Sequence, residues 1–79
     1  MTQSINEPIS VVASSVAGRI IPRAFSWHGR KYEQLQVSSQ WPVMEGKYAI
    51  RYFSLFDGSN LYKVRLQTEL MIWELVSII

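Results

Sequence analysis

The sequence predicts an all-β protein, an antiparallel meander of about six short strands. Two phrases, residues 25–32 and 52–62, each set aromatic residues two apart around a His-Gly or an Asp-Gly pair, which is the pattern of a β-hairpin. In addition, residues 47–56 and 61–67 alternate apolar and polar side chains, as half-buried strands do. A meander of this length is expected to curl into a small open barrel or a strongly bent sheet.

The elements follow from the turn residues and from the β-branched and aromatic runs between them. Pro22 restricts its strand to an edge or a bulge because proline has no N–H to donate. Tyr32 and Leu35 are three residues apart, so in a regular strand these two apolar side chains would point to opposite faces. This indicates a bulge or a strand buried on both faces. In order, we expect a strand at residues 9–13, a turn at 14–18, strands at 19–27 and 30–37 joined by His28-Gly29, an irregular loop at 38–46 containing Trp41-Pro42, and strands at 47–56 and 61–67.

The last segment, residues 70–79, is apolar except for Glu74 and Ser77. Its β-branched residues and Trp73 favour a final strand, whereas its length and Thr68 as an N-cap leave a short helix open. In either form the segment is expected in the core or against a partner, since an apolar end is costly to expose.

Length and composition predict one domain. The chain has 79 residues, 48% of them hydrophobic, and no cysteine, so neither disulfides nor thiolate zinc sites support its core. We expect a frayed N-terminus at residues 1–8 and a single β domain at residues 9–79. A small unsupported core favours self-association. No basic region precedes the apolar residues near the N-terminus, and residues 70–79 are too short to cross a bilayer, so a cytoplasmic protein without membrane contact is expected.

The register of the hairpin at residues 47–67 determines which side chains share a face. A three-residue loop, Gly58-Ser59-Asn60, pairs Phe56 with Tyr62 and Tyr52 with Leu66, and so gathers apolar residues on one side. A four-residue loop sets Tyr52 opposite Arg65 and mixes the faces. Because a buried face specifies register, the three-residue loop is favoured.

That register predicts a basic face with an aromatic centre. All eight Lys and Arg residues lie at positions 19–65, against three acidic residues there, a net charge of +5 for that stretch. Basic groups beside exposed rings suit nucleic acid, because phosphates attract cations and bases stack on rings. A solvated sheet face is the plainer interpretation, and we favour it. The candidate nucleic-acid-binding residues are Arg51, Phe53, Lys63 and Arg65, with Arg30 and Lys31 of the preceding hairpin.

The sequence offers few candidates for catalytic or metal-binding residues. The single histidine, His28, falls at a loop tip, and Glu33, Glu45 and Asp57 are too scattered to form a metal-ligand set. The glycines are isolated at turns and build no phosphate loop. We therefore expect no catalytic residues, no cofactor and no metal, and hence not an enzyme.

The phrase Phe-x-Trp-x-Gly-Arg-x-Tyr at residues 25–32 resembles the opening of a small bacterial domain family of unknown function. The pairs Tyr52-Phe53 and Asp57-Gly58, then Leu61-Tyr62, and finally Trp73-Glu74-Leu75 stand in the order of that family. A similar module is appended to the C-terminus of some Y-family polymerase relatives. The resemblance spans residues 9–79 and implies a small β accessory module associated with DNA repair, without catalytic residues. Residues 67–71 depart from the acidic and Thr-Gly turn that precedes the last strand in that family.

The sequence thus favours a non-enzymatic β interaction module that binds protein or itself. A nucleic-acid-binding module on the basic face is the alternative. The residues expected to mediate self-association are Leu70, Ile72, Val76, Ile78 and Ile79.

Overall fold

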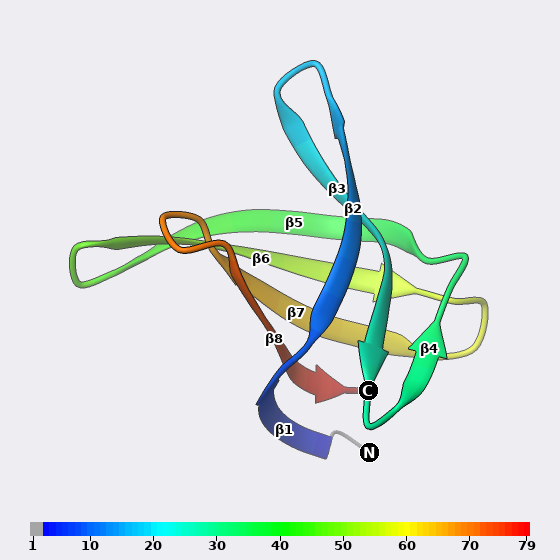
Figure 1. Cartoon of the computed structure of the whole chain (residues 1–79). Helices are drawn as coiled ribbons and strands as arrows, with labels where there is room; N and C mark the ends of the chain where they lie inside the picture. Colours follow the sequence, from blue (N-terminus) through cyan, green and yellow to red (C-terminus); the bar gives the residue numbers. More distant parts are fainter. Residues whose placement is uncertain (1–2) are drawn as a thin grey trace.

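The strands form two antiparallel sheets in a computed structural model that describes residues 3–79 (Figure 1). One sheet has five strands in the order β1-β8-β7-β6-β5, and the other has three in the order β2-β3-β4. The strands are β1 (Gln3–Pro8), β2 (Ser10–Val16), β3 (Arg19–Trp27), β4 (Arg30–Tyr32), β5 (Gln36–Glu45), β6 (Tyr48–Phe56), β7 (Leu61–Gln67) and β8 (Ile72–Ile78). The all-β, antiparallel prediction is confirmed. The prediction of six strands is wrong, since there are eight in the described residues, and the two sheets share no ladder that would close a barrel.

The chain moves between the sheets at two short connections. It passes from β1 to β2 at Ile9, whose N–H donates to the carbonyl of Trp73, and it returns from β4 to β5 over residues 33–35. At the second connection Gln34 has a positive φ of 56° and Leu35 is buried. This break explains why the apolar residues Tyr32 and Leu35 do not fit one alternating strand. The strand expected at residues 30–37 is divided between the two sheets.

Two tight hairpins build the three-stranded sheet. His28 and Gly29 have φ values of 52° and 74°, and Trp27 pairs with Arg30, so the predicted two-residue loop is confirmed. The register of β2 and β3 shifts between Val12 and Ala13, which leaves a bulge beside Pro22, as its missing N–H requires. The turn expected at residues 14–18 is shorter, because only Ala17 and Gly18 lie between the strands.

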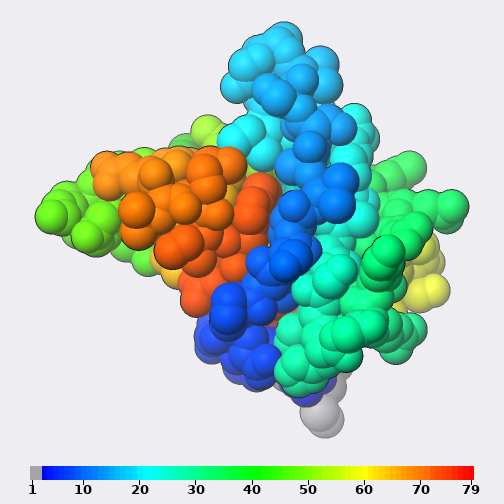
Figure 2. Space-filling model, viewed as in Figure 1, coloured from blue at the N-terminus to red at the C-terminus, as the bar shows by residue number. Residues whose placement is uncertain are grey.

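The β2–β3 hairpin, called the arm below, extends beyond the edge of the five-stranded sheet (Figures 1 and 2). Its lower part covers one face of that sheet, which we call the inner face; the opposite face is the outer face. The core lies between the inner face and the three-stranded sheet. Its buried members are Phe25, Leu35, Phe53, Leu55, Tyr62, Val64, Leu66, Trp73 and Leu75.

The register of β6 and β7 differs from the prediction by one residue. Tyr52 lies opposite Arg65 and Phe53 opposite Val64, so the loop has four residues, Asp57 to Asn60. The Asp57 carboxylate accepts hydrogen bonds from the N–H groups of Ser59 and Asn60 at 2.9 and 2.8 Å. This turn, together with a buried face built on Phe53 rather than Tyr52, makes the three-residue loop wrong.

Three further expectations about the elements have clear outcomes. Residues 38–46 are not an irregular loop, because residues 36–45 form β5, an edge strand on which Pro42 is tolerated. Residues 3–8 are not frayed but pair with β8, while Met1 and Thr2 lie outside the described residues. The final segment is a strand, as favoured, and not a helix.

Candidate functional site

A row of four side chains crosses the outer face. Trp41 of β5, Tyr52 of β6, Arg65 of β7 and Glu74 of β8 stand opposite one another in consecutive strand pairs. Side chains directly opposite in antiparallel strands share a face, so the register alone brings these four together. Trp, Tyr and Arg are the residue types most enriched at the energetic centres of protein interfaces.

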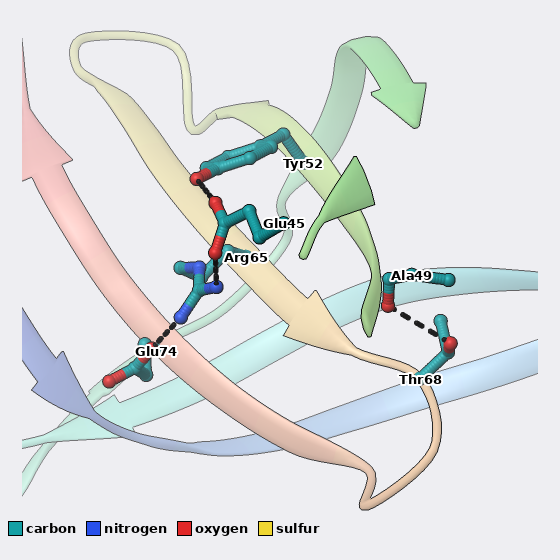
Figure 3. Close-up of polar contacts among 6 residues, drawn as sticks. All are labelled: Glu45, Ala49, Tyr52, Arg65, Thr68 and Glu74. Atoms are coloured by element: carbon teal, nitrogen blue, oxygen red, sulfur yellow. Dashed lines mark hydrogen bonds and ion pairs between the residues drawn. The ribbon is translucent and has the colours of Figure 1, made fainter. Parts of the chain in front are cut away.

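Polar contacts fix Tyr52, Arg65 and Glu74 of this row (Figure 3). The Arg65 guanidinium donates to the carboxylates of both Glu74 and Glu45, and the Tyr52 hydroxyl donates to the second oxygen of Glu45 at 2.9 Å. Burial, aided by the hydrogen bond to Glu45, raises the pKa of Tyr52. Partial burial opposes the charge of Arg65, but Glu74 and Glu45 outweigh it and raise the pKa of Arg65. Four groups from four strands are therefore held in one geometry.

The aromatic end of the row is also ordered. The rings of Trp41 and Tyr52 stack with their centroids 5.7 Å apart and their planes 11° apart. The Lys63 ammonium lies 5.1 Å from the centroid of Tyr52 and 5.8 Å from that of Trp41. A cation over stacked rings is attracted to their electron-rich faces and keeps the side chains in place.

A shallow hollow of about 220 Å³ adjoins the charged end of the row. Its apolar residues are Ile50, only 3% exposed although it is on the outer face, and Tyr48 and Ile72, which are 37% and 46% exposed. Gln67 also lines the hollow, and its carboxamide oxygen is buried with no hydrogen-bond partner among the described residues. An unpartnered buried acceptor costs stability, so Gln67 weakens this end of the sheet.

The residues expected to form a basic face are not brought together. Phe53 is fully buried in the core, and Arg51 lies with it on the inner face. Lys63 and Arg65 lie on the outer face, where Arg65 is neutralised by two carboxylates. Arg30 and Lys31 are exposed on β4 of the other sheet. The predicted face is wrong because the register that it requires is wrong by one residue.

The residues expected to mediate self-association are also dispersed. They lie in β8 or beside it, and β8 pairs with β1 and β7, so its edges are not free. Ile72 borders the outer hollow and Leu70 is exposed in the turn before β8, whereas Ile78 packs on the core and Ile79 is exposed at the far end of the strand. Val76 is half-buried at the bulge of β8.

Sequence reasoning missed Trp41, Glu45, Tyr48 and Glu74 as site residues. Trp41 and Glu45 were assigned to a loop because Pro42 stands between them. The spacing of Trp41 and Val43, two apart between the polar residues Gln40 and Glu45, was the signal that could have identified β5 as a strand. Glu74 follows directly from the register of β7 and β8.

The site offers little for covalent chemistry. His28 is exposed and lies 2.8 Å from Glu7, which also accepts the indole N–H of Trp27, and no serine hydroxyl shares this contact. In residues 3–79, no three His, Asp or Glu side chains gather as metal ligands, and no helix could cross a membrane. The arrangement on the outer face can bind, through rings, fixed charges and an apolar hollow.

Comparison with protein-family models, with curated proteins and with solved structures gives no match. The class that the fold and the site define is a small two-sheet antiparallel β protein with an ordered aromatic and charged outer face.

Proposed function

We propose that the protein is a non-enzymatic β interaction module that binds a second copy of itself through the outer face. The observation that carries this proposal is the row Trp41–Tyr52–Arg65–Glu74 beside a hollow with exposed apolar walls. Such a surface has rigid rings and an arginine at its centre. Residues of these types contribute most of the binding free energy of protein interfaces.

Charge favours a protein partner over nucleic acid at this face. The two carboxylates of Glu45 and Glu74 balance the cations of Arg65 and Lys63. A balanced surface does not attract a polyanion, but it can meet its own copy across a two-fold axis without repulsion. Leu70 and Met71, which precede Ile72 in the β7–β8 turn, are also exposed.

The proposal is tested by the mass in solution as a function of concentration. We expect the weight-average mass in sedimentation equilibrium to rise from 9.2 kDa towards twice that value for the native protein. The variants Ile72→Glu and Tyr48→Glu should remain monomeric, because each places a charge at the wall of the hollow. Both side chains are exposed enough for the fold to tolerate the change.

Val12→Glu is the matched control. Val12 is 68% exposed on β2 of the other sheet, so a charge there should leave the association unchanged. A native protein that stays monomeric at millimolar concentration, or an equal effect of Val12→Glu, would contradict the proposal.

A further inference from the structure

A cleft of about 360 Å³ lies between the tip of the arm and the inner face of the five-stranded sheet. Leu66 of β7 and Ile20 of β3 provide its apolar walls. The polar lining comes from three separate parts of the fold: Arg19 at the base of the arm turn, Gln40 and Arg51 on β5 and β6, and Thr68 after β7.

The two arginines of this cleft have no acidic partner. Within residues 3–79 neither Arg19 nor Arg51 forms an ion pair, and Glu69, the acidic residue next to the cleft, pairs with no cation. Arg51 is half-buried and donates only to the carboxamide oxygen of Gln40, at 3.4 Å. Arg65, the other half-buried arginine, has two glutamates. A guanidinium that is partly desolvated without an anion is electrostatically unsatisfied.

The free groups of the cleft are nearly all donors. Arg19 and most N–H groups of Arg51 are unused, and the Gln40 oxygen is occupied by Arg51, which leaves its NH₂ group to donate. The Thr68 hydroxyl already donates to the carbonyl of Ala49 (Figure 3). The parallel N–H groups of one guanidinium are enough to bind a planar carboxylate. Two guanidinium groups and an amide, which come from different strands, suit a tetrahedral anion with several oxygens.

We infer that this arm cleft binds a phosphate group, held between Arg19 and Arg51. The cleft lies on the inner face, away from the surface proposed for self-association, so the two sites are independent. Free phosphate, a phosphomonoester and the phosphodiester of an oligonucleotide share this chemistry, and the experiment distinguishes them.

The test is an NMR titration of the uniformly ¹⁵N-labelled protein, following the Nε–Hε signals of Arg19 and Arg51. Inorganic phosphate, adenosine 5′-monophosphate and a short oligothymidylate are added separately, at constant ionic strength set with chloride. We expect saturable shifts of both signals. Arg19→Gln and Arg51→Gln should each weaken the binding about tenfold, as loss of a charge-assisted hydrogen bond does.

Two further arginine variants serve as controls. Arg30→Gln removes an exposed arginine on β4 and should leave the affinity unchanged, and Arg51→Lys should bind with an intermediate affinity because it keeps the charge without the fork. Arg19 is exposed next to a turn, so its variant should keep the native backbone spectrum. Equal affinity for all three probes identifies phosphate itself as the ligand, and tighter binding of one ester identifies its source.

Three results would overturn the inference. The first is the absence of saturable shifts, the second is binding that survives both glutamine variants, and the third is tighter binding of citrate than of phosphate. Since none of these concerns mass in solution, failure here is distinct from failure of the self-association proposal.

Discussion

Tyr52 lies directly opposite Arg65, and this one pairing determines the face of every residue in β6 and β7. With Tyr52 and Arg65 on the outer face, the alternate residues Phe53 and Val64 must point into the core. Both are completely buried. A shift of one residue would set Phe53 opposite Arg65 on a single face, so that either the ring would be exposed or the guanidinium would be buried.

Phe53→Ala tests this assignment. Removal of a fully buried phenylalanine side chain should lower the free energy of unfolding by about 3–5 kcal/mol, which is enough to unfold much of so small a domain. Phe56→Ala is the matched control. Because Phe56 is 40% exposed, its removal should lower the free energy of unfolding far less. Urea unfolding followed by circular dichroism compares them, and equal losses would contradict the register.

The fold can be predicted from the sequence where local chemistry decides the structure. The His28-Gly29 loop, the bulge at Pro22 and the final strand all follow from residues close together in the chain. It cannot be predicted in this way where contacts between distant residues decide. The choice between a three-residue and a four-residue loop depends on the three-stranded sheet covering Phe53. The sequence of β6 does not decide it, because β6 has apolar residues on both faces and either register buries some of them.

The candidate site was harder to predict for the same reason. Arg65 was among the candidate residues, but its partners Glu45 and Glu74 lie 20 and 9 residues away in sequence. Only the strand order β8-β7-β6-β5 brings these carboxylates to one guanidinium. A one-residue error in register was sufficient to replace a balanced surface by an apparently basic one.

The ion pairs of Arg65 should contribute modestly to stability. Arg65→Gln leaves two glutamates near each other without their cation, and we expect a loss of about 1 kcal/mol, limited by solvent screening at this partly exposed site. The loss should shrink as salt is raised from low to about 1 M, because ions screen the pair. Lys47→Gln is the control, since Lys47 is exposed and forms no ion pair in the described residues. A salt-independent loss would show that packing, not charge, is responsible.

Stability should decrease in acid. The hydrogen bond from Tyr62, and then those from the Asn60 and Ser59 N–H groups, lower the pKa of Asp57; hydrogen bonds from Trp27 and His28 lower the pKa of Glu7. Because both pKa values are lower in the folded state, the unfolded chain binds protons more readily, and stability present above about pH 4 is lost as the pH falls through the folded values. The urea midpoint should therefore fall between about pH 5 and pH 3. The double variant Glu7→Gln, Asp57→Asn should show a shallower decline, and an unchanged slope would refute this origin.

Glu7 should also hold the edge strand β1 against the other sheet. Its carboxylate accepts the Trp27 indole N–H at 3.2 Å and lies 2.8 Å from the His28 ring, and both partners belong to the β3–β4 hairpin. Edge strands open more readily than central ones, so loss of this contact should act on β1 before the rest of the fold. In Glu7→Ala we expect the amides of β1 to exchange with deuterium several times faster, while those of the central strand β7 stay protected. Glu7→Gln should be intermediate, because its amide oxygen can still accept from Trp27. Equal exchange in all three proteins would mean that pairing with β8 alone retains β1.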